Sequence, residues 1–447
     1  MMRRCSASWG CNRRIPDARG DGGAAARRKQ MTWLEDGWRH VWLPYAQMQT
    51  APLPMAAART EGARIILEDG RELIDGIASW WTACHGYNHP HIRQAVAKQL
   101  EAMPHVMFGG LAHEPAYRLS TRLAALMPGD LNRVFFTDSG SVSVEVAIKI
   151  AVQSRLNKGE RGRTKILAFS GGYHGDTLGT MAICDPEEGM HSLFTGLLLE
   201  HKVVKMPKDG PSIAAFEAFL EREHKTLAAI IVEPLVQGAG GMVFHGRQVL
   251  QRLRAAADHY GLTLIFDEIF TGFGRSGTMF AFEQAGVAPD IITLSKALTG
   301  GTSPLAATIA TDRLFEAFLS DSPATALMHG PTYMAHALGC AAANASLDLF
   351  ESEPRLAQAA AISAQMEREL EPCRGLPGVK DVRVKGAIGV VQMHEIKDPA
   401  SLRQRLIAEG VWVRPFRDIV YLTPAFTVSP EELSRLTGAI RRVLTAP

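Results

Sequence analysis

Two charged residues, Asp267 and Lys296, stand where two short apolar runs of the sequence end. The first run covers residues 262–266 and the second covers residues 291–294. Apolar runs of this length, bounded by turn residues, are typical of buried strands in a parallel sheet. Because ligands bind beyond the carboxyl ends of such strands, the sequence predicts a carboxylate and an amine at one edge of the sheet.

A carboxylate beside an amine suits pyridoxal phosphate in particular. This cofactor needs a lysine that holds its aldehyde and an acid beside its ring nitrogen, which keeps the ring protonated. Lys296 meets the first need and Asp267 meets the second. The same spacing also suits an aspartate that caps a helix and a lysine on the surface, and spacing alone does not decide between these interpretations.

A third strand end carries a serine-rich turn. A strand over residues 133–137 leads into Ser139-Gly140-Ser141 and then into a helix that runs to about Leu156. The free N–H groups at the start of such a helix form a phosphate cradle, to which Ser141 adds a hydroxyl. An ordinary helix cap by Ser139 or Ser141 is the alternative.

Two more strand ends place polar groups at the same edge. The strand over 165–169 is followed by Gly-Gly and then by Tyr173 and His174, either of which suits stacking on a flat ring. A packed loop aromatic is the other interpretation. The strand over 228–232 delivers Glu233, a further carboxylate.

The order of the expected elements predicts an α/β fold. Strands alternate with helices from 133 to 310, which indicates a mostly parallel central sheet flanked by helices, and a smaller α+β lobe follows from about Ser352. A chain of 447 residues exceeds a single ordinary core. We expect four regions: an extension over 1–30 that is disordered or precedes the true start at Met31, a segment over 31–86 that joins the small lobe, a large cofactor-binding domain over 87–344, and a C-terminal small domain over 345–447.

Composition argues against several classes of protein. The net charge is +2 and no basic stripe interleaves with aromatic residues, so nucleic acid is not expected as a partner. No apolar run approaches the roughly 20 residues that a membrane helix needs. The six cysteines are scattered without a Cys-x-x-Cys pair, so we expect neither a metal site nor a disulfide framework, and a reducing cytoplasm fits.

Adjacent tryptophans, Trp80 and Trp81, follow a hairpin signal at Asp69-Gly70. If this run is a strand, neighbouring side chains face opposite sides, and we expect one tryptophan to face a pocket. A single arginine beside a strand, Arg414, is by itself more often a surface charge.

These residues match a known family. The chain resembles the class III, pyridoxal-phosphate-dependent aminotransferases of fold type I, with its hallmark in Ile265 to Gly277 and Leu294 to Gly301. The resemblance covers nearly everything from Trp33 to the C-terminus, but not residues 1–30. A narrower resemblance rests on Ser79 to Thr82, Gly86 to Pro90, His105 to Leu111, Asp138 to Glu145, Gly171 to Thr177, His329 to Thr332 and Val413 to Phe416.

The narrower resemblance implies the substrates. It is to members that move the amino group of S-adenosyl-L-methionine to 8-amino-7-oxononanoate in biotin biosynthesis, giving 7,8-diaminononanoate by a ping-pong mechanism. Lysine stays open as the donor. The nearest alternative is a class III ω-amino-acid aminotransferase that uses pyruvate or 2-oxoglutarate, and a cofactor-binding protein without transferase activity is a more distant one.

The resemblance also implies roles for individual residues. Lys296 would hold the cofactor and move the proton, Asp267 would pair with the ring nitrogen, and Tyr173 would stack on the ring. Glu233 would lie by the cofactor and pair with an arginine, for which Arg275 is the candidate. The remaining implied residues are Gly140 and Ser141 at the phosphate, Pro331 and Thr332 reaching it from the partner subunit of a homodimer, Tyr45, Trp80, Trp81 and Gly330 at the substrates, and Arg414 at the keto acid's carboxylate. An arginine fork suits that carboxylate, and tryptophans suit its apolar chain.

Overall fold

The computed structural model describes residues 32–185, 192–194 and 196–445. The chain divides into two compact units, Met1–Ala56 and Ala57–Pro447. The first unit contains α1 (Trp33–Trp38), which begins with a capping box: the Thr32 hydroxyl accepts from the N–H of Glu35, and the Glu35 carboxylate accepts from the N–H of Thr32. The extension expected over residues 1–30 lies outside the described residues.

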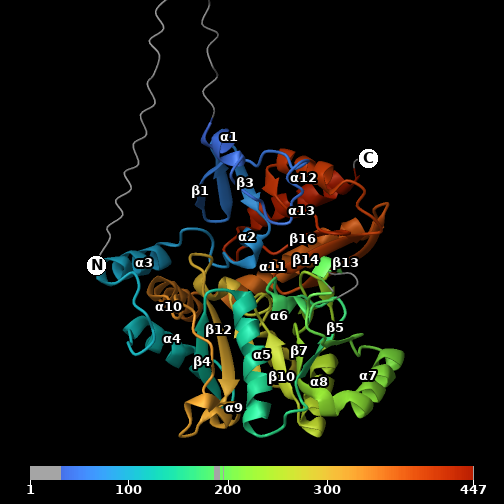
Figure 1. Cartoon of the computed structure of the whole chain (residues 1–447). Coiled ribbons are helices and arrows are strands. Elements are labelled where there is room, and N and C mark those ends of the chain that lie inside the picture. The colour runs from blue at the N-terminus through green and yellow to red at the C-terminus, as the bar shows by residue number, and fades with distance from the viewer. Residues whose placement is uncertain (1–31, 186–191, 195, 446–447) are drawn as a thin grey trace, which may run out of the picture. The chain divides into compact units, whose positions relative to one another are not determined.

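A seven-stranded sheet forms the centre of the second unit (Figure 1). Across the sheet, its strands are β4 (Leu131–Thr137), β12 (Ala306–Thr311), β11 (Ile291–Leu294), β10 (Thr263–Asp267), β7 (Leu227–Val232), β5 (Lys165–Phe169) and β6 (Lys202–Val204). β12 runs antiparallel to both neighbours, and the strands from β11 to β6 are parallel to one another. The prediction of a mostly parallel sheet is therefore confirmed.

Alternate residues of the central strands pack against opposite layers of the fold. In β10, Ile265 belongs to the apolar cluster that includes α5 (Gly140–Asn157), whereas Phe266 belongs to the cluster that includes α8 (Arg247–Tyr260). Burial on both faces explains why these strands are continuous apolar runs in the sequence. By the same alternation, Asp267 points to the side of the sheet where α5 begins.

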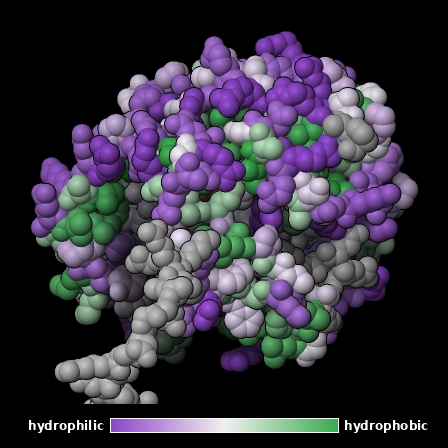
Figure 2. All heavy atoms as spheres, turned by 90° about the horizontal axis from the view of Figure 1, so that it is seen from above, coloured by the Kyte–Doolittle hydropathy of each residue, from purple (hydrophilic) through white to green (hydrophobic). Residues whose placement is uncertain are grey.

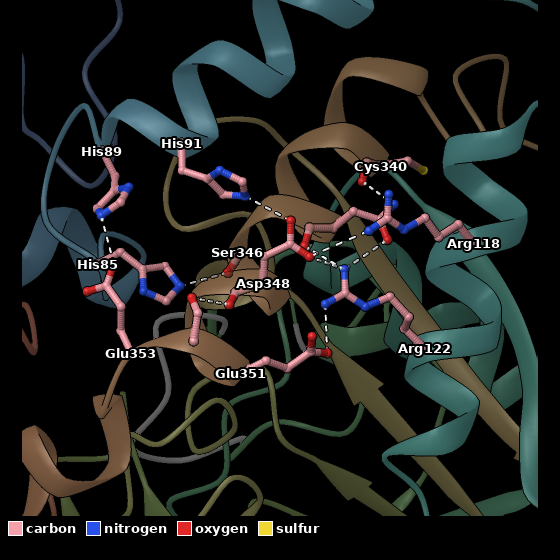
Figure 3. A network of polar contacts seen from close by, with 12 residues as sticks. His85, His89, His91, Arg118, Arg122, Cys340, Ser346, Asp348, Glu351 and Glu353 are labelled. Carbon is pink, nitrogen blue, oxygen red and sulfur yellow. Dashed lines mark hydrogen bonds and ion pairs between the residues drawn. The ribbon is translucent and has the colours of Figure 1, made fainter.

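Beside the sheet, α10 (Ala337–Ser352) packs against both α3 (Pro90–Ala102) and α4 (Glu114–Ala125). Asp348 on α10 ties them together, because its carboxylate lies 2.8 Å from Nε2 of His91 on α3 and 2.8 Å from Nη1 of Arg122 on α4 (Figure 3). Arg122 also pairs with Glu351, one helical turn further along α10, at 2.7 Å. A shared network of this kind fixes helix positions more firmly than isolated surface pairs do.

The rest of the second unit contains smaller sheets with their own helices. A three-stranded antiparallel sheet consists of β13 (Val379–Lys385), β14 (Ile388–Met393) and β16 (Ile419–Leu422), and a four-stranded one of β1 (Ala57–Glu61), β2 (Arg64–Leu67), β3 (Glu72–Asp75) and β15 (Val411–Trp412). The other elements used below or visible in Figure 1 are α2 (Ala78–Trp81), α6 (Leu178–Met181), α7 (Gly210–Glu223), β8 (Val236–Gln237), β9 (Val243–Phe244), α9 (Asp312–Phe315), α11 (Arg355–Leu370), α12 (Pro399–Ala408) and α13 (Pro430–Thr445).

The four-stranded sheet joins segments that are far apart in the sequence. β2 and β3 form the hairpin predicted around Asp69-Gly70, and β3 pairs in parallel with β15, with Ile74 opposite Val411. Chain segments near residue 75 and near residue 412 therefore lie side by side. The domain boundaries drawn from the sequence stay a prediction.

The C-terminal helix α13 is amphipathic. It buries Leu433, Leu436 and Ile440 and leaves charged residues such as Arg441 at the surface. Seen from above, the molecule presents mostly hydrophilic side chains, with smaller groups of hydrophobic ones between them (Figure 2). Within the described residues, no helix is both long and apolar enough to cross a membrane.

Candidate active site

A cavity of about 170 Å³ lies at the carboxyl edge of the central sheet. Its walls are formed by Trp81, Gly140, Ser141, Tyr173, His174, Gly175, Glu233, Ala239, Asp267, Ile269, Phe270, Ser295 and Lys296. Apart from Trp81, which belongs to α2, these residues end or follow β4, β5, β7, β10 and β11, whose carboxyl ends meet at this edge. The strand ends that the sequence singled out are thus brought together, as expected for an open parallel sheet.

Asp267 is held by donors on both of its oxygens. Oδ2 lies 2.7 Å from Nδ1 of His174, and Oδ1 accepts from the hydroxyl of Thr293 at 3.2 Å and from the N–H of Ile269 at 3.1 Å. Burial by itself would lower the pKa of His174, but the hydrogen bond and charge of Asp267 outweigh it and raise that pKa. The carboxylate is therefore fixed in place beside an imidazole whose protonated form it favours.

Lys296 comes two residues after the end of β11 and shares the cavity with Asp267. Its backbone φ is +45°, a left-handed value that is unusual for a residue with a side chain and is typical of functional positions. Burial lowers the pKa of its amine, opposed by the charges of Asp267 and Glu233. The Nζ atom lies 4.8 Å from the ring centroid of Trp81. The interpretation of Lys296 as a solvated surface lysine is wrong.

The start of α5 supplies a cradle for an anion. Ser139 caps the helix by accepting from the N–H of Val142, while Gly140 and Ser141 line the cavity. The first N–H groups of a helix have no partner inside the helix and carry the positive end of its dipole. The Ser139 cap is thus present, and the role of Gly140 and Ser141 at a phosphate stays a prediction.

Gly175 closes this cradle from the other side. Its φ is +132°, and a Cβ there would stand 2.2 Å from the Ser141 Oγ. The Oγ accepts from the N–H of Asp176 at 3.2 Å. The shape of the cradle therefore depends on a residue without a side chain at this position.

Glu233 is buried and binds backbone, not an arginine. Its carboxylate accepts from the N–H groups of Tyr173 at 3.0 Å and Gly238 at 2.9 Å, and burial raises its pKa to about 7. The expected pair with Arg275 is wrong for the described part of the chain. Arg275 donates instead to the carbonyl oxygens of Ala387, which lies between β13 and β14, and of Pro424, which follows β16.

The two adjacent tryptophans do not lie in a strand. They belong to α2, where Ala78, Ser79, Trp80 and Trp81 all have positive φ, with values of +46°, +46°, +56° and +76°. A left-handed conformation costs roughly 1–2 kcal/mol for each residue that has a side chain. The two tryptophan rings nevertheless have different surroundings. Trp81 lines the cavity, whereas the Trp80 ring centroid lies 4.8 Å from the guanidinium carbon of Arg414.

Six of the expected site residues are not among those that line the cavity: Trp80 and Arg414, which contact each other, and Tyr45, Gly330, Pro331 and Thr332. Tyr45 belongs to the first unit, where it is 54% exposed with φ of +52°. Gly330, Pro331 and Thr332 lie in the segment before α10. The resemblance placed Pro331 and Thr332 across a subunit boundary, so their roles stay predictions.

Sequence reasoning missed the main role of one residue. His174 was considered for ring stacking, whereas its Nδ1 binds Asp267. The signal was present, because a histidine at the end of a strand can reach a carboxylate at the end of a nearby strand. Phe270, which packs on Trp81 with ring centroids 4.2 Å apart, was not singled out either.

The residues of the cavity fit pyridoxal phosphate. The cavity offers an amine, an anchored carboxylate, a helix start with a hydroxyl for a phosphate, and aromatic side chains for a flat ring. Lys296 and Asp267 stand on the walls of the same cavity, so one ligand can contact both side chains.

Comparison with known proteins gives one consistent result. The family model "Aminotransferase class-III" matches residues 45–444. The adenosylmethionine-8-amino-7-oxononanoate aminotransferase of Mycobacterium leprae is 45% identical over 413 residues, which cover 90% of this chain and 94% of that protein.

Solved structures of similar proteins share the fold. That of the adenosylmethionine-8-amino-7-oxononanoate aminotransferase from Methanocaldococcus jannaschii matches with a TM-score of 0.87 and 28% identity, covering 91% of this chain and 97% of that one. An amine transaminase from an uncultivated Pseudomonas species, in a PLP-bound form, matches with a TM-score of 0.85 and 32% identity, covering 90% of this chain and 98% of that one. The chain therefore belongs to the class III aminotransferase family.

Proposed function

We propose that this chain is a pyridoxal-phosphate-dependent aminotransferase that moves the amino group of S-adenosyl-L-methionine to 8-amino-7-oxononanoate. The observation that carries the proposal is the shared cavity of Lys296 and Asp267 at the start of α5. The choice of substrates is supported by the name and the 45% identity of the relative from M. leprae. The choice of substrates is also supported by the contact between Arg414 and Trp80.

Pyridoxal phosphate supplies, when bound, an aldehyde that takes up the amino group and a ring that withdraws electrons. Lys296 holds and moves the proton at its Nζ, and because burial lowers its pKa, the amine is more readily neutral and can accept a proton. Asp267 keeps a proton at the ring nitrogen, and His174 and Thr293 orient its oxygens for that task.

The start of α5 binds the phosphate. The N–H groups of Gly140 and Ser141, at the positive end of the helix dipole, would hold it, and the Ser141 hydroxyl would add a donor. Because the Ser141 Oγ accepts from Asp176, its own proton remains available among the described residues. Tyr173, whose N–H is fixed by Glu233, lines the cavity and would stack on the ring.

The acceptor is recognised by its two ends. Its carboxylate binds the guanidinium of Arg414, which offers a planar fork of donors. Its apolar chain lies along Trp80 and Trp81, which also exclude water from the amine of Lys296. The two tryptophans thus offer an apolar surface for the chain of such a keto acid, and Arg414 offers a cation for its carboxylate.

A second candidate is an aminotransferase for other amines, since the PLP-bound amine transaminase from Pseudomonas is 32% identical. Product formation by the purified holoenzyme decides between the two. We expect 7,8-diaminononanoate from S-adenosyl-L-methionine and 8-amino-7-oxononanoate, and little turnover of an ω-amino acid with pyruvate. Turnover of the second pair alone would overturn the proposal. Loss of the cofactor's absorbance band after addition of S-adenosyl-L-methionine or lysine, each tested separately, identifies the donor.

The enzyme works as a homodimer with shared sites in the cytoplasm. Support for the dimer comes from exposed apolar side chains on either side of Gly330, Pro331 and Thr332, since Met328 is 75% exposed and Tyr333 is 54% exposed. Support for the cytoplasm comes from four buried cysteines that stay reduced, Cys84, Cys184, Cys340 and Cys373. Light scattering tests the dimer, and a monomeric mass at working concentration would contradict it.

A further inference from the structure

Asp75 is a buried carboxylate at the end of β3, and three donors converge on it. Asp75 is 1% exposed. Its Oδ1 accepts from the N–H of Ile77 at 2.8 Å, and its Oδ2 accepts from the N–H of Ser79 at 2.8 Å and from the hydroxyl of Tyr87 at 2.5 Å. Two of the donors thus belong to the backbone that enters the tryptophan turn, Ala78–Trp81.

The tryptophan turn needs support from outside. It contains four consecutive residues at positive φ, none of which is glycine, and the intrinsic conformational preferences of these residues do not favour such a turn. Asp75 binds the N–H of Ser79 inside it. Tyr87 donates its only hydroxyl proton to Asp75, so the Ser79 hydroxyl must donate to the Tyr87 oxygen, 2.6 Å away. Ser79 is therefore held by its backbone and by its side chain.

The same strand pair also fixes the segment that carries Arg414. Asp75 stands opposite Trp412 in the pairing of β3 with β15, and the N–H of Gly76 donates to the Trp412 carbonyl at 2.9 Å. Arg414 follows two residues later. One junction therefore sets both the direction of Trp80 and the place from which Arg414 reaches over it.

We propose that Asp75, together with Tyr87, is a positioning residue that sets acceptor specificity by holding the tryptophan turn, so that Trp80 meets Arg414 and Trp81 covers Lys296. This inference rests on the proposed function, because a keto acid with a distant carboxylate gives the Trp80–Arg414 pair its role. Asp75 touches neither substrate nor cofactor. It acts through the turn alone.

The test uses the full-length holoenzyme with Asp75→Asn and Tyr87→Phe. The amide of the first variant puts a donor where a carboxylate oxygen accepted, and the second removes one donor and leaves the charge. The matched control is Asp69→Asn, which changes an exposed carboxylate in the same hairpin; among the described residues it binds only Arg71. Tyr87→Phe carries the test if Asp75→Asn does not fold.

We expect Asp75→Asn to raise KM for 8-amino-7-oxononanoate by at least about 10-fold, and to raise KM for the donor several-fold less. Tyr87→Phe should show the same split with a smaller size, and Asp69→Asn should show neither change. Adding Ala78→Gly to Asp75→Asn should bring KM for the acceptor back toward the wild-type value, because glycine adopts positive φ without strain. Equal changes in both KM values, or no recovery with Ala78→Gly, would overturn the proposal.

Near-ultraviolet circular dichroism gives a readout that needs no substrate. If Asp75 holds the turn, the aromatic bands from Trp81 and its neighbour Phe270 weaken in Asp75→Asn and return with Ala78→Gly. Unchanged bands in Asp75→Asn would overturn the inference. A wild-type enzyme that does not convert 8-amino-7-oxononanoate would instead refute the proposed function, and the spectra would still judge the turn.

Discussion

Nδ1 of His174 lies 2.7 Å from Oδ2 of Asp267, and both side chains are buried at the floor of the cavity. The two residues come from β5 and β10, which are separated in the sheet by β7. His174 thus helps to orient a carboxylate that lines the cavity, as residues that bind functional side chains from behind do.

Replacing His174 by alanine should lower kcat roughly 10- to 100-fold, in the range seen when a residue that orients a functional ligand is removed. The reason is that Asp267 loses its shortest hydrogen bond. Steady-state kinetics at saturating cofactor measures the effect. His174→Asn, which keeps a donor near the position of Nδ1, should retain more activity than His174→Ala, and equal losses would contradict an orienting role.

The His174–Asp267 pair also predicts how stability depends on pH. The pKa of His174 is raised in the folded protein, so the pair's contribution is complete below about 6.5, the unfolded value, and disappears as pH rises through the folded value. The difference in melting temperature between wild type and His174→Asn should therefore be largest near pH 6 and shrink toward pH 9. A difference in melting temperature that grows with pH would contradict a raised pKa of His174 in this pair.

Replacing Lys296 by alanine should abolish turnover, with a loss of at least about 10³-fold, while the start of α5 still retains some cofactor. No other amine lines the cavity among the described residues. Lys225→Ala, at an exposed position beyond α7, is the matched control and should keep the wild-type rate. Cofactor retained after gel filtration separates loss of chemistry from loss of binding, and a Lys296→Ala variant with normal rates would refute the assignment.

Shared sites in a dimer can be tested by mixing two impaired variants, Lys296→Ala and Thr332→Ala. If Thr332 reaches the partner's cavity, a hybrid dimer contains one site with both wild-type residues, and random pairing should restore about a quarter of wild-type activity. If both residues served the same subunit's cavity, no hybrid site would be intact. Activity measured after coexpression, with each variant alone as the control, distinguishes the two arrangements.

The strands and the positions of Asp267 and Lys296 could be predicted because their signals are local. Buried strands with both faces covered must be continuous apolar runs, and the residue after each run falls at the edge where ligands bind. The serine cap and the glycine at the start of α5 were equally visible in the sequence. Recognition of the family then added roles to these positions.

Contacts that depend on distant segments could not be predicted in this way. Adjacent tryptophans such as Trp80 and Trp81 are typical of a strand. The structure instead places them in a left-handed turn that Asp75 and Tyr87 hold, and no periodicity of the sequence links those two residues to the turn. The partner of Glu233 was misassigned because a buried carboxylate can be satisfied by backbone N–H groups as well as by an arginine. Pairing of side chains is decided by tertiary packing, which local patterns do not record.

Replacing Arg414 by alanine should raise KM for the keto acid by about 10-fold or more, and far less for the amino donor. A charge-assisted hydrogen bond contributes on the order of 1.5–3 kcal/mol, and only the acceptor presents a carboxylate at this end. Arg414→Lys keeps the charge but loses the planar fork, so its KM should lie between those of wild type and Arg414→Ala. Equal effects on both substrates would place the carboxylate elsewhere.

Gly175 lies at the phosphate cradle and Gly159 lies away from it, so alanine substitutions at these two positions form a matched pair. Both have positive φ, +132° and +83°, but a Cβ at Gly159 meets nothing within 4 Å, whereas one at Gly175 would collide with the Ser141 Oγ. Gly159→Ala should therefore lower the free energy of unfolding by about 1 kcal/mol, through backbone strain alone. Gly175→Ala should lower it by a further 1–3 kcal/mol or so, as overpacking does.

The sharper difference between these two variants should appear in cofactor affinity. Displacing Ser141 moves a hydroxyl and an N–H away from the phosphate, so Gly175→Ala should raise the Kd for pyridoxal phosphate by about 10-fold or more, the equivalent of one charge-assisted hydrogen bond. Gly159→Ala should leave it unchanged. Titration of the apoenzyme with cofactor, followed by absorbance, measures both values, and equal affinities in the two variants would mean that Ser141 does not bind the phosphate.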